Sequence, residues 1–352
     1  MAKKNRIFDA TVPFLGGKRK LVSAIEQHFQ GETLADVFMG GGSVALRAKQ
    51  LGMRVIANDI AERSRIVGDS LIANGTVRLT DEDVYALFVP AVHDGFIRAN
   101  YVPKVFIPEV ADFLDNAFAN ARSRTGIKRE LSLLLLMKYV LALRQYGAFQ
   151  VGRQDNAMLI EGKEVELLEL ASESRGKKIA HNLSHPLTLL LRLKDQINFG
   201  IFPNGKQNEV RRMDCFDFLR MLHERGEVVD TAYFDSPYSG TTVYSDHYRI
   251  LDEILEGKKG FEIDDEGFNA RDALGNFEKL FSLSEFMHRW IVSMGYNPAS
   301  NVGIRGEDLL GVVRKFREAD LFPMSHNWTI NNIAAKSGKK QSENVEYLIV
   351  TK

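Results

Sequence analysis

The residues best placed to do chemistry are Asp235, Ser236, Pro237 and Tyr238, which follow directly after the apolar segment 228–234. That segment is typical of a buried strand. Such a strand would carry a carboxylate, a backbone carbonyl, a rigid proline and an aromatic ring to the carboxyl edge of a sheet, where α/β proteins bind ligands. A simple turn is the alternative, but folding alone gives little reason for these groups to end a buried strand. We therefore interpret this DSPY motif as the candidate catalytic element.

A second candidate site is the glycine-rich segment LADVFMGGGSVAL at residues 34–46. Its pattern predicts a strand, a tight turn and a helix. Glycines allow a ligand to approach the backbone, and the free amides at the start of a helix attract a carboxylate or a phosphate. A purely structural turn and a dinucleotide site both remain open, because the pattern overlaps the general nucleotide fingerprint.

Asp59 ends the next apolar segment, RVIANDI, roughly twenty positions after the glycine turn, where nucleotide-binding folds place an acidic ribose ligand. This position favours a cofactor that contains adenosine. The alternative is an ordinary cap on the helix that follows.

Alternating strands and helices at both ends of the chain must position these residues. We predict helices at 17–29 and 43–50, and strands at 33–38, 53–57, 209–213, 228–234, 289–294, about 309–316 and 345–351. The chain is largely helical between these two groups. The pattern predicts an α/β fold with a Rossmann-like, mixed and mostly parallel sheet of about seven strands. Residues 1–79 and 206–352 would form this domain, and residues 80–205 a helical insert.

The composition fits a protein with a sizeable core. The 352 residues are 45% hydrophobic, and 46 basic residues balance 46 acidic ones. Any surface for nucleic acid must therefore be local, because the chain has no overall positive field. The lone cysteine, Cys215, excludes an internal disulfide and a cysteine-rich zinc site. Without an apolar stretch suited to a signal peptide or a membrane span, we expect a soluble, cytoplasmic protein.

Taken in order, the motifs resemble those of the Dam-like DNA adenine-N6 methyltransferases. The family's aromatic-x-Gly-Gly-Lys element is matched by PFLGGKRKL, its acidic-Pro-Phe-x-Gly-x-Gly element by residues 36–42, and its catalytic Asp-Pro-Pro-Tyr element by DSPY. The segment RRMDCFDFL matches an acidic element that precedes the catalytic strand, and NVEYLIVTK resembles the closing strand. The resemblance covers both ends of the chain but not residues 80–205.

The resemblance implies S-adenosylmethionine as the cofactor, with no metal. It assigns cofactor binding to Phe14, Lys18, Asp36, Phe38, Gly40, Gly42, Asp59, Asp214 and Asp235, and catalysis to Asp235, Ser236, Pro237 and Tyr238. The Asp235 carboxylate and the Ser236 carbonyl would accept the two hydrogens of the N6 amine of a flipped-out adenine, while Tyr238 stacks on the base. Ser236 replaces a proline of the family motif but keeps the carbonyl, and Val37 replaces another proline.

Other functions remain open from the sequence. Cytosine N4 and an adenine in RNA present the same kind of amine, and a catalytically silent DNA-binding module could keep the fold. A nicotinamide-dependent oxidoreductase would explain the glycine turn but gives the DSPY motif no role. Cys215 lacks the neighbouring proline of a cytosine-C5 nucleophile, so we interpret it as a small core residue. Asp246 and His247 alone are a weak metal-ligand set.

The insert is the natural candidate for target recognition. Its basic side chains could contact DNA phosphates, although each cluster could equally be a solvated helix end. The candidates are Arg122, Arg124, Lys128, Arg144, Arg153, Lys177 and Lys178. The basic segment 336–341 could also meet the DNA backbone. We expect a monomer that acts on double-stranded DNA, with a cognate restriction enzyme as a further partner.

Overall fold

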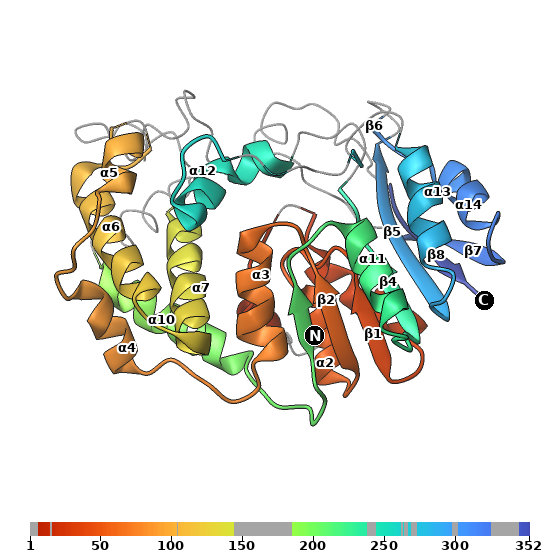
Figure 1. The fold of residues 1–352 in the computed structure, drawn as a ribbon, viewed down its shortest axis with the longest axis horizontal. Helices are drawn as coiled ribbons and strands as arrows, with labels where there is room; N and C mark the ends of the chain where they lie inside the picture. Colours follow the sequence, from red (N-terminus) through yellow and green to blue (C-terminus); the bar gives the residue numbers. More distant parts are fainter. Residues whose placement is uncertain are drawn as a thin grey trace.

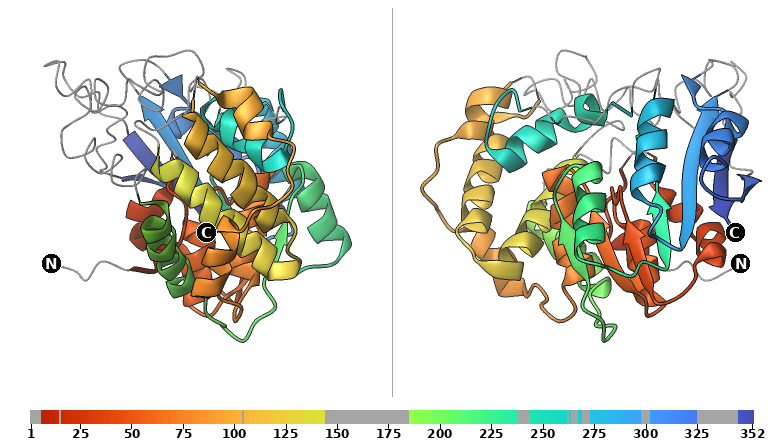
Figure 2. Two further views of the ribbon diagram at one scale, coloured as in Figure 1. Left: turned by 90° about the vertical axis from the view of Figure 1, so that its left-hand side faces the viewer. Right: turned by 45° about the vertical axis from the view of Figure 1, so that its right-hand side comes forward.

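The sheet with its flanking helices and a second group of helices occupy opposite sides of the molecule (Figure 1). A computed structural model describes residues 6–14, 16–103, 105–143, 185–237, 244–261, 263, 267–268, 273–297, 302–324 and 345–352. Figure 1 shows the sheet with its flanking helices on one side and a group of helices from the middle of the chain on the other, and the right-hand view of Figure 2 shows the same division from another direction.

The sheet is mixed and mostly parallel, with the order β3-β2-β1-β4-β5-β8-β7 and a short β6 paired to β5. Neighbours from β3 to β5 are parallel, whereas β8 runs antiparallel between β5 and β7. The predicted Rossmann-like fold class is confirmed. The strands are β1 Thr33–Asp36, β2 Arg54–Asn58, β3 Glu209–Arg211, β4 Thr231–Phe234, β5 Arg289–Asn297, β6 Val302–Gly303, β7 Ala319–Met324 and β8 Val345–Thr351.

Helices cover both faces of the sheet because its strands are apolar on both sides. Alternate residues of one strand enter different cores: Leu34 and Val55 pack on one face, and Ala35 and Ile56 on the other. The first face is covered by α1 Val22–Ile25, α2 Ser43–Gln50 and α3 Glu62–Gly68. The second is covered by α11 Cys215–Glu224, α13 Leu274–Leu283 and α14 Gly306–Val313.

The middle of the chain forms a helical group around α7, Gly126–Ala142, which is buried along almost its whole length. Its neighbours include α3 of the sheet side, α6 and α10, so a single apolar cluster runs from the sheet face into these helices. The other helices are α4 Asp81–Tyr85, α5 Phe96–Tyr101, α6 Pro108–Arg122, α10 Pro186–Phe199 and α12 Tyr244–Glu256. None of the helices in the described part of the chain is long and apolar enough to cross a membrane.

Two sequence-based predictions of local structure are wrong. Residues 306–313 form α14, and the strand expected at about 309–316 lies further on, as β7. Leu309, Val312 and Val313 are buried together at helical spacing, which a short apolar run does not distinguish from a strand. The helix expected at 17–29 is broken into η2 Lys18–Lys20, α1 and η3 Glu26–His28.

Candidate active site

The DSPY motif follows β4 in the middle of the sheet. Asp235, Ser236 and Pro237 line a cavity, whereas Tyr238 lies outside the described residues. Ser236 is buried, and the Asp235 side chain is 18% exposed. The motif is therefore part of the cavity wall and not a turn on the surface.

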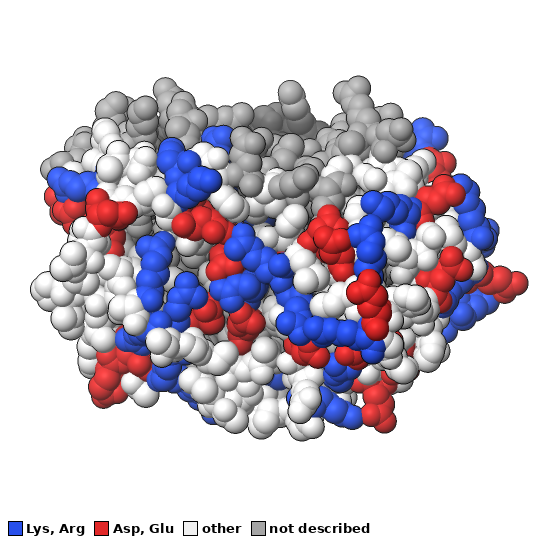
Figure 3. Space-filling view, in the orientation of Figure 1, with Lys and Arg blue, Asp and Glu red and all other residues white. Residues whose placement is uncertain are grey.

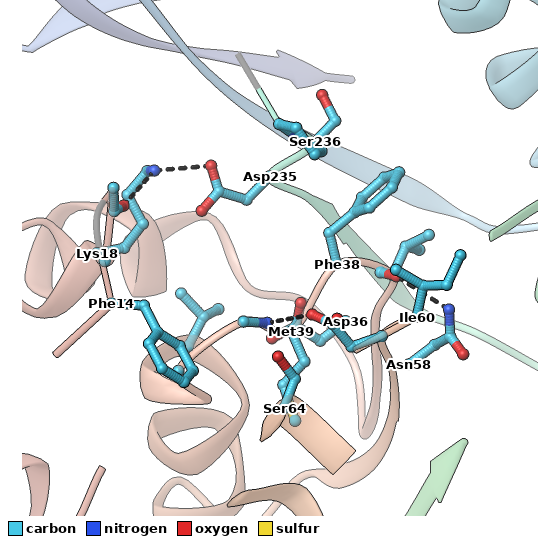
Figure 4. A pocket seen from close by; sticks show the side chains of 18 of the residues that line it. Phe14, Lys18, Asp36, Phe38, Met39, Asn58, Ile60, Ser64, Asp235 and Ser236 are labelled. Carbon is cyan, nitrogen blue, oxygen red and sulfur yellow. Dashed lines mark hydrogen bonds and ion pairs between the residues drawn. The ribbon is translucent and has the colours of Figure 1, made fainter. Parts of the chain in front are cut away.

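The cavity lies where three neighbouring parallel strands end. β1 ends at Asp36, β2 at Asn58 and β4 at Phe234, so the residues at these ends meet at one edge of the sheet. Figure 4 shows the side chains of Asp36, Asn58 and Asp235 around the cavity, with Phe14 and Lys18 approaching from the N-terminal segment. The α/β pattern thus brings the glycine turn and the DSPY motif together.

Lys18 holds the Asp235 carboxylate from the N-terminal side. Its ammonium lies 2.7 Å from Asp235 Oδ1 and 3.3 Å from Glu346 Oε1, and it donates a 2.8 Å hydrogen bond to the Gly16 carbonyl. Burial alone would lower the pKa of Lys18, but the two carboxylates outweigh this effect and raise it. Lys18 is therefore a fixed, charged group of the site.

Asp235 is held in an environment that disfavours its charge. Burial raises the pKa of Asp235 to about 6, against the opposing effect of Lys18. Figure 4 shows one carboxylate oxygen facing Lys18 and the other turned away from it. A carboxylate in this setting accepts hydrogen bonds strongly while it is ionised and can also hold a proton near neutral pH.

The glycine turn joins β1 to α2 and needs its glycines for two different reasons. Gly40 and Gly42 have φ values of 53° and 74°, in the left-handed region that side chains disfavour. A Cβ on Gly41 would lie 2.5 Å from the Val12 carbonyl oxygen. The turn is thus packed directly against the N-terminal segment that carries Phe14 and Lys18.

Asp36 is a buried carboxylate whose oxygens have no hydrogen bond of normal geometry among the described residues. Burial raises its pKa well above the ordinary value, and the charges of Asp235 and Asp59 add to this rise, while the nearby amides of Ala45 and Phe38 lower it in part. Such a group costs stability unless a ligand supplies a partner. A cationic donor in the cavity, such as an ammonium group, would satisfy it.

Asp59 both shapes the glycine turn and faces the cavity. Its carboxylate accepts hydrogen bonds from the amides of Gly40, at 2.8 Å, and Ala61, at 2.9 Å. The second bond resembles the helix-capping role considered from the sequence, because Ala61 directly precedes α3. Each carboxylate oxygen has a further lone pair that a ribose hydroxyl could use.

The remaining predicted cofactor residues occupy different settings. Phe14 and Phe38 line the cavity; Phe14 contacts Tyr248 of α12 edge to face at 5.0 Å, and Phe38 contacts Phe268 at 5.4 Å. Asp214 caps α11 by accepting bonds from the amides of Phe216 and Asp217. The next residue, Cys215, is buried against the cavity.

The DNA-binding candidates that the structure describes form ion pairs or hydrogen bonds within the protein. Arg124 and Lys128 both pair with Asp83, and Arg122 donates to the Ile254 carbonyl while lying over the Phe118 ring. Figure 3 shows basic and acidic side chains interspersed over the face in view. Arg144, Arg153, Lys177, Lys178 and the segment 336–341 lie outside the described residues.

Sequence reasoning missed several polar residues of the site. Asn58 lines the cavity with a buried amide oxygen that has no partner among the described residues, and Arg63 of α3 lies over the rings of Phe14 and Tyr248. Arg63 also pairs with Asp252 of α12, deep in the protein. Glu346 had a usable signal in the sequence, since it is a charged residue within an apolar strand.

No cluster of three or more metal-ligating side chains occurs among the described residues.

The comparisons with known proteins agree with this geometry. Residues 14–132 match the family model of D12 class N6 adenine-specific DNA methyltransferases. The type II methyltransferase M2.HphI of Haemophilus parahaemolyticus is 26% identical over 343 residues, covering 96% of this chain and 97% of that protein. The modification methylase LlaI of Lactococcus lactis subsp. lactis is 25% identical over 370 residues, covering 95% of this chain and 54% of that protein. These similarities support an adenine-N6-specific DNA methyltransferase.

Proposed function

We propose that the chain transfers the methyl group of S-adenosylmethionine to N6 of a flipped-out adenine in double-stranded DNA. The observation that carries this proposal is the pair of carboxylates at the ends of two adjacent parallel strands, the buried Asp36 and the partly buried Asp235, which line one cavity. Asp36 has no hydrogen bond of normal geometry among the described residues, and Asp235 is held by an ammonium. The first suits a cationic ligand, and the second suits an amine that donates hydrogens.

The cofactor half of the cavity would be formed by the N-terminal segment and the glycine turn. Asp36 would pair with the ammonium of the methionine moiety, which the Gly40–Gly42 turn would border, and Asp59 would accept bonds from the ribose hydroxyls. Phe14 and Phe38 offer apolar ring surfaces, and Asp214 would take the adenine amine in addition to capping α11. When bound, S-adenosylmethionine supplies a methyl group made electrophilic by the positive sulfur.

The base half would be formed by the DSPY motif. An exocyclic amine is a poor nucleophile because its lone pair is delocalised into the ring. Acceptance of its two hydrogens by the Asp235 carboxylate and the Ser236 carbonyl favours a more tetrahedral nitrogen with the lone pair directed into the cavity. Pro237 restricts the loop, and Tyr238 would stack on the base.

Asp235 would also accept the proton that the reaction releases. Once the nitrogen has used its lone pair in the new bond to carbon, it must lose one of its hydrogens. The pKa of Asp235 is raised to about 6, so this carboxylate can accept the proton and return it to solvent. No covalent enzyme intermediate is needed.

The predicted insert, residues 80–205, would contact the DNA around the flipped base through its basic side chains. The two relatives are named a type II methyltransferase and a modification methylase. We therefore extend the proposal to a role as the modification partner of a restriction enzyme, with the monomer as the acting unit.

The test is incubation of the purified protein with isotopically labelled S-adenosylmethionine and unmodified mixed-sequence DNA, followed by mass spectrometry of the nucleosides. Labelled N6-methyladenine is the expected product. Labelled N4-methylcytosine would mean that the target base is cytosine and that Asp235 has the same chemical role. An absence of label in a protein that binds both cofactor and DNA would refute the proposal and favour an RNA substrate or a silent module.

A further inference from the structure

The strand β8 runs antiparallel to its neighbours, and this direction brings its first residues to the edge of the sheet where the parallel strands end. Glu346 lies there, on the same face of the sheet as Leu348 and Val350. Its side chain is 1% exposed. An apolar residue would continue this row at a lower desolvation cost, so folding alone does not explain a carboxylate at this position.

Among the described residues, Lys18 and Ser293 are polar neighbours of Glu346. The Lys18 ammonium lies 3.3 Å from Glu346 Oε1, and Ser293 of the adjacent strand β5 donates to the same oxygen at 3.3 Å. Lys18 also forms an ion pair with Asp235 Oδ1, at 2.7 Å, and donates a 2.8 Å hydrogen bond to the Gly16 carbonyl. The position of Lys18 is therefore fixed from three sides.

We propose that Glu346 is a positioning residue for methyl transfer, which acts by sharing the Lys18 ammonium with the catalytic Asp235. This inference rests on the proposed function. Glu346 competes with Asp235 for Lys18, so the bond from Lys18 to Asp235 is weaker than it would be in an isolated pair. Asp235 consequently keeps more of its capacity to accept the hydrogens of the substrate amine.

The charged and titratable groups around Asp235 determine the direction in which its pKa should change in each variant. Lys18 favours the ionised form of Asp235, whereas Glu346 and Asp36 disfavour it, and the nearby Ser293 side chain favours it. The Tyr233 hydroxyl is buried beside the same group. Removal of the Glu346 charge should thus lower the pKa of Asp235, and removal of the Ser293 hydroxyl should raise it. A purely structural role would move neither.

The test compares the wild type with Glu346→Gln and Ser293→Ala in single-turnover methyl transfer, at saturating cofactor and DNA, from about pH 5 to 9. Glu278→Gln is the control, because Glu278 loses the same charge from an exposed pair with Lys315. We expect the acid limb of Glu346→Gln to move down by about one pH unit, the lower end of what a nearby like charge contributes. Its plateau rate should fall about tenfold or less. The acid limb of Ser293→Ala should move up, and that of Glu278→Gln should stay in place.

An infrared titration without cofactor or DNA provides a second readout. The protonated-carboxyl band that Asp235→Asn removes belongs to Asp235, and in Glu346→Gln it should disappear at lower pH than in the wild type. Unchanged midpoints in both assays would overturn the inference, even if the variant is less stable. If Glu346→Gln does not fold, an unshifted midpoint in Ser293→Ala overturns it instead. A wild type that methylates no DNA would refute the proposed function, while the infrared result would still decide the role of Glu346.

Discussion

The carboxyl edge of the sheet and the helical group differ in how their charged side chains are paired. In the helical group, the partly exposed Arg124 and Lys128 both pair with Asp83, so each cation has an anionic partner within the fold. At the sheet edge, Asp36 is buried with no hydrogen bond of normal geometry in the described part of the chain, and Asp235 shares its only described ion-pair partner, Lys18, with Glu346. The first arrangement stabilises a structure, and the second leaves interactions for a ligand to complete.

The largest effect should follow removal of the Asp235 carboxylate. We expect Asp235→Ala to lower the single-turnover rate of methyl transfer by about 1,000-fold or more, because a preorganised acceptor for the amine is lost. The fold should persist, since Lys18 keeps Glu346 and the Gly16 carbonyl as partners. Circular dichroism and cofactor binding provide the controls. Full methyl transfer by a folded Asp235→Ala protein would end the proposed mechanism.

A smaller effect, on binding and not on the chemical step, should follow from a change at Asp36. We expect Asp36→Asn to weaken the binding of S-adenosylmethionine by about 100-fold, the scale for removal of one partner of a buried charge pair. Isothermal titration calorimetry measures this affinity directly.

The same variant should raise the stability of the protein without cofactor. The pKa of Asp36 is raised in the folded state, so this carboxyl lowers the stability of the folded protein least at low pH, where it is protonated. As the pH rises through the folded pKa, the folded protein loses stability relative to the unfolded chain. The gain in thermal midpoint of Asp36→Asn over the wild type should therefore widen with pH. Equal midpoints at every pH would mean that Asp36 already has a partner in the free protein.

The next effect tests the junction between the two regions. Arg63 of α3 pairs with Asp252 of α12 and contacts the rings of Phe14 and Tyr248. We expect Arg63→Ala to lower the free energy of unfolding by about 3–5 kcal/mol, because Asp252 remains buried without its cation. Urea denaturation measures the loss.

The control for this junction is the double variant Arg63→Met with Asp252→Leu, which should recover most of the stability because both charges are gone. Recovery of stability without recovery of cofactor affinity would show that Arg63 also serves the binding site. Equal stability of Arg63→Ala and the wild type would contradict the assignment of this pair as a structural link.

The sequence was sufficient for the elements that carry local signals. Apolar alternation and the glycine turn predicted β1, α2 and β2 to within a few residues, and the apolar run before Asp235 predicted β4. Residues 309–316 were misassigned because a short apolar run fits a strand or a buried helix equally well. The contacts of Lys18 with Glu346 and of Arg63 with Asp252 join residues that are distant in the chain, so no local pattern could reveal them.

The smallest effect should come from the paired charges of the helical group, and it separates the two explanations of the basic clusters. Arg124→Ala should lower the free energy of unfolding by about 1–2 kcal/mol, because Asp83 loses one of its partners. If Arg124 is structural, the dependence of DNA affinity on salt should be unchanged. If it binds a phosphate, the slope of log affinity against log salt should fall by about one. Arg153→Ala is the matched comparison, since this candidate belongs to the same predicted insert. A reduced slope in Arg124→Ala would show that charges paired within the fold can still serve DNA, and the contrast between the two regions would then be one of degree.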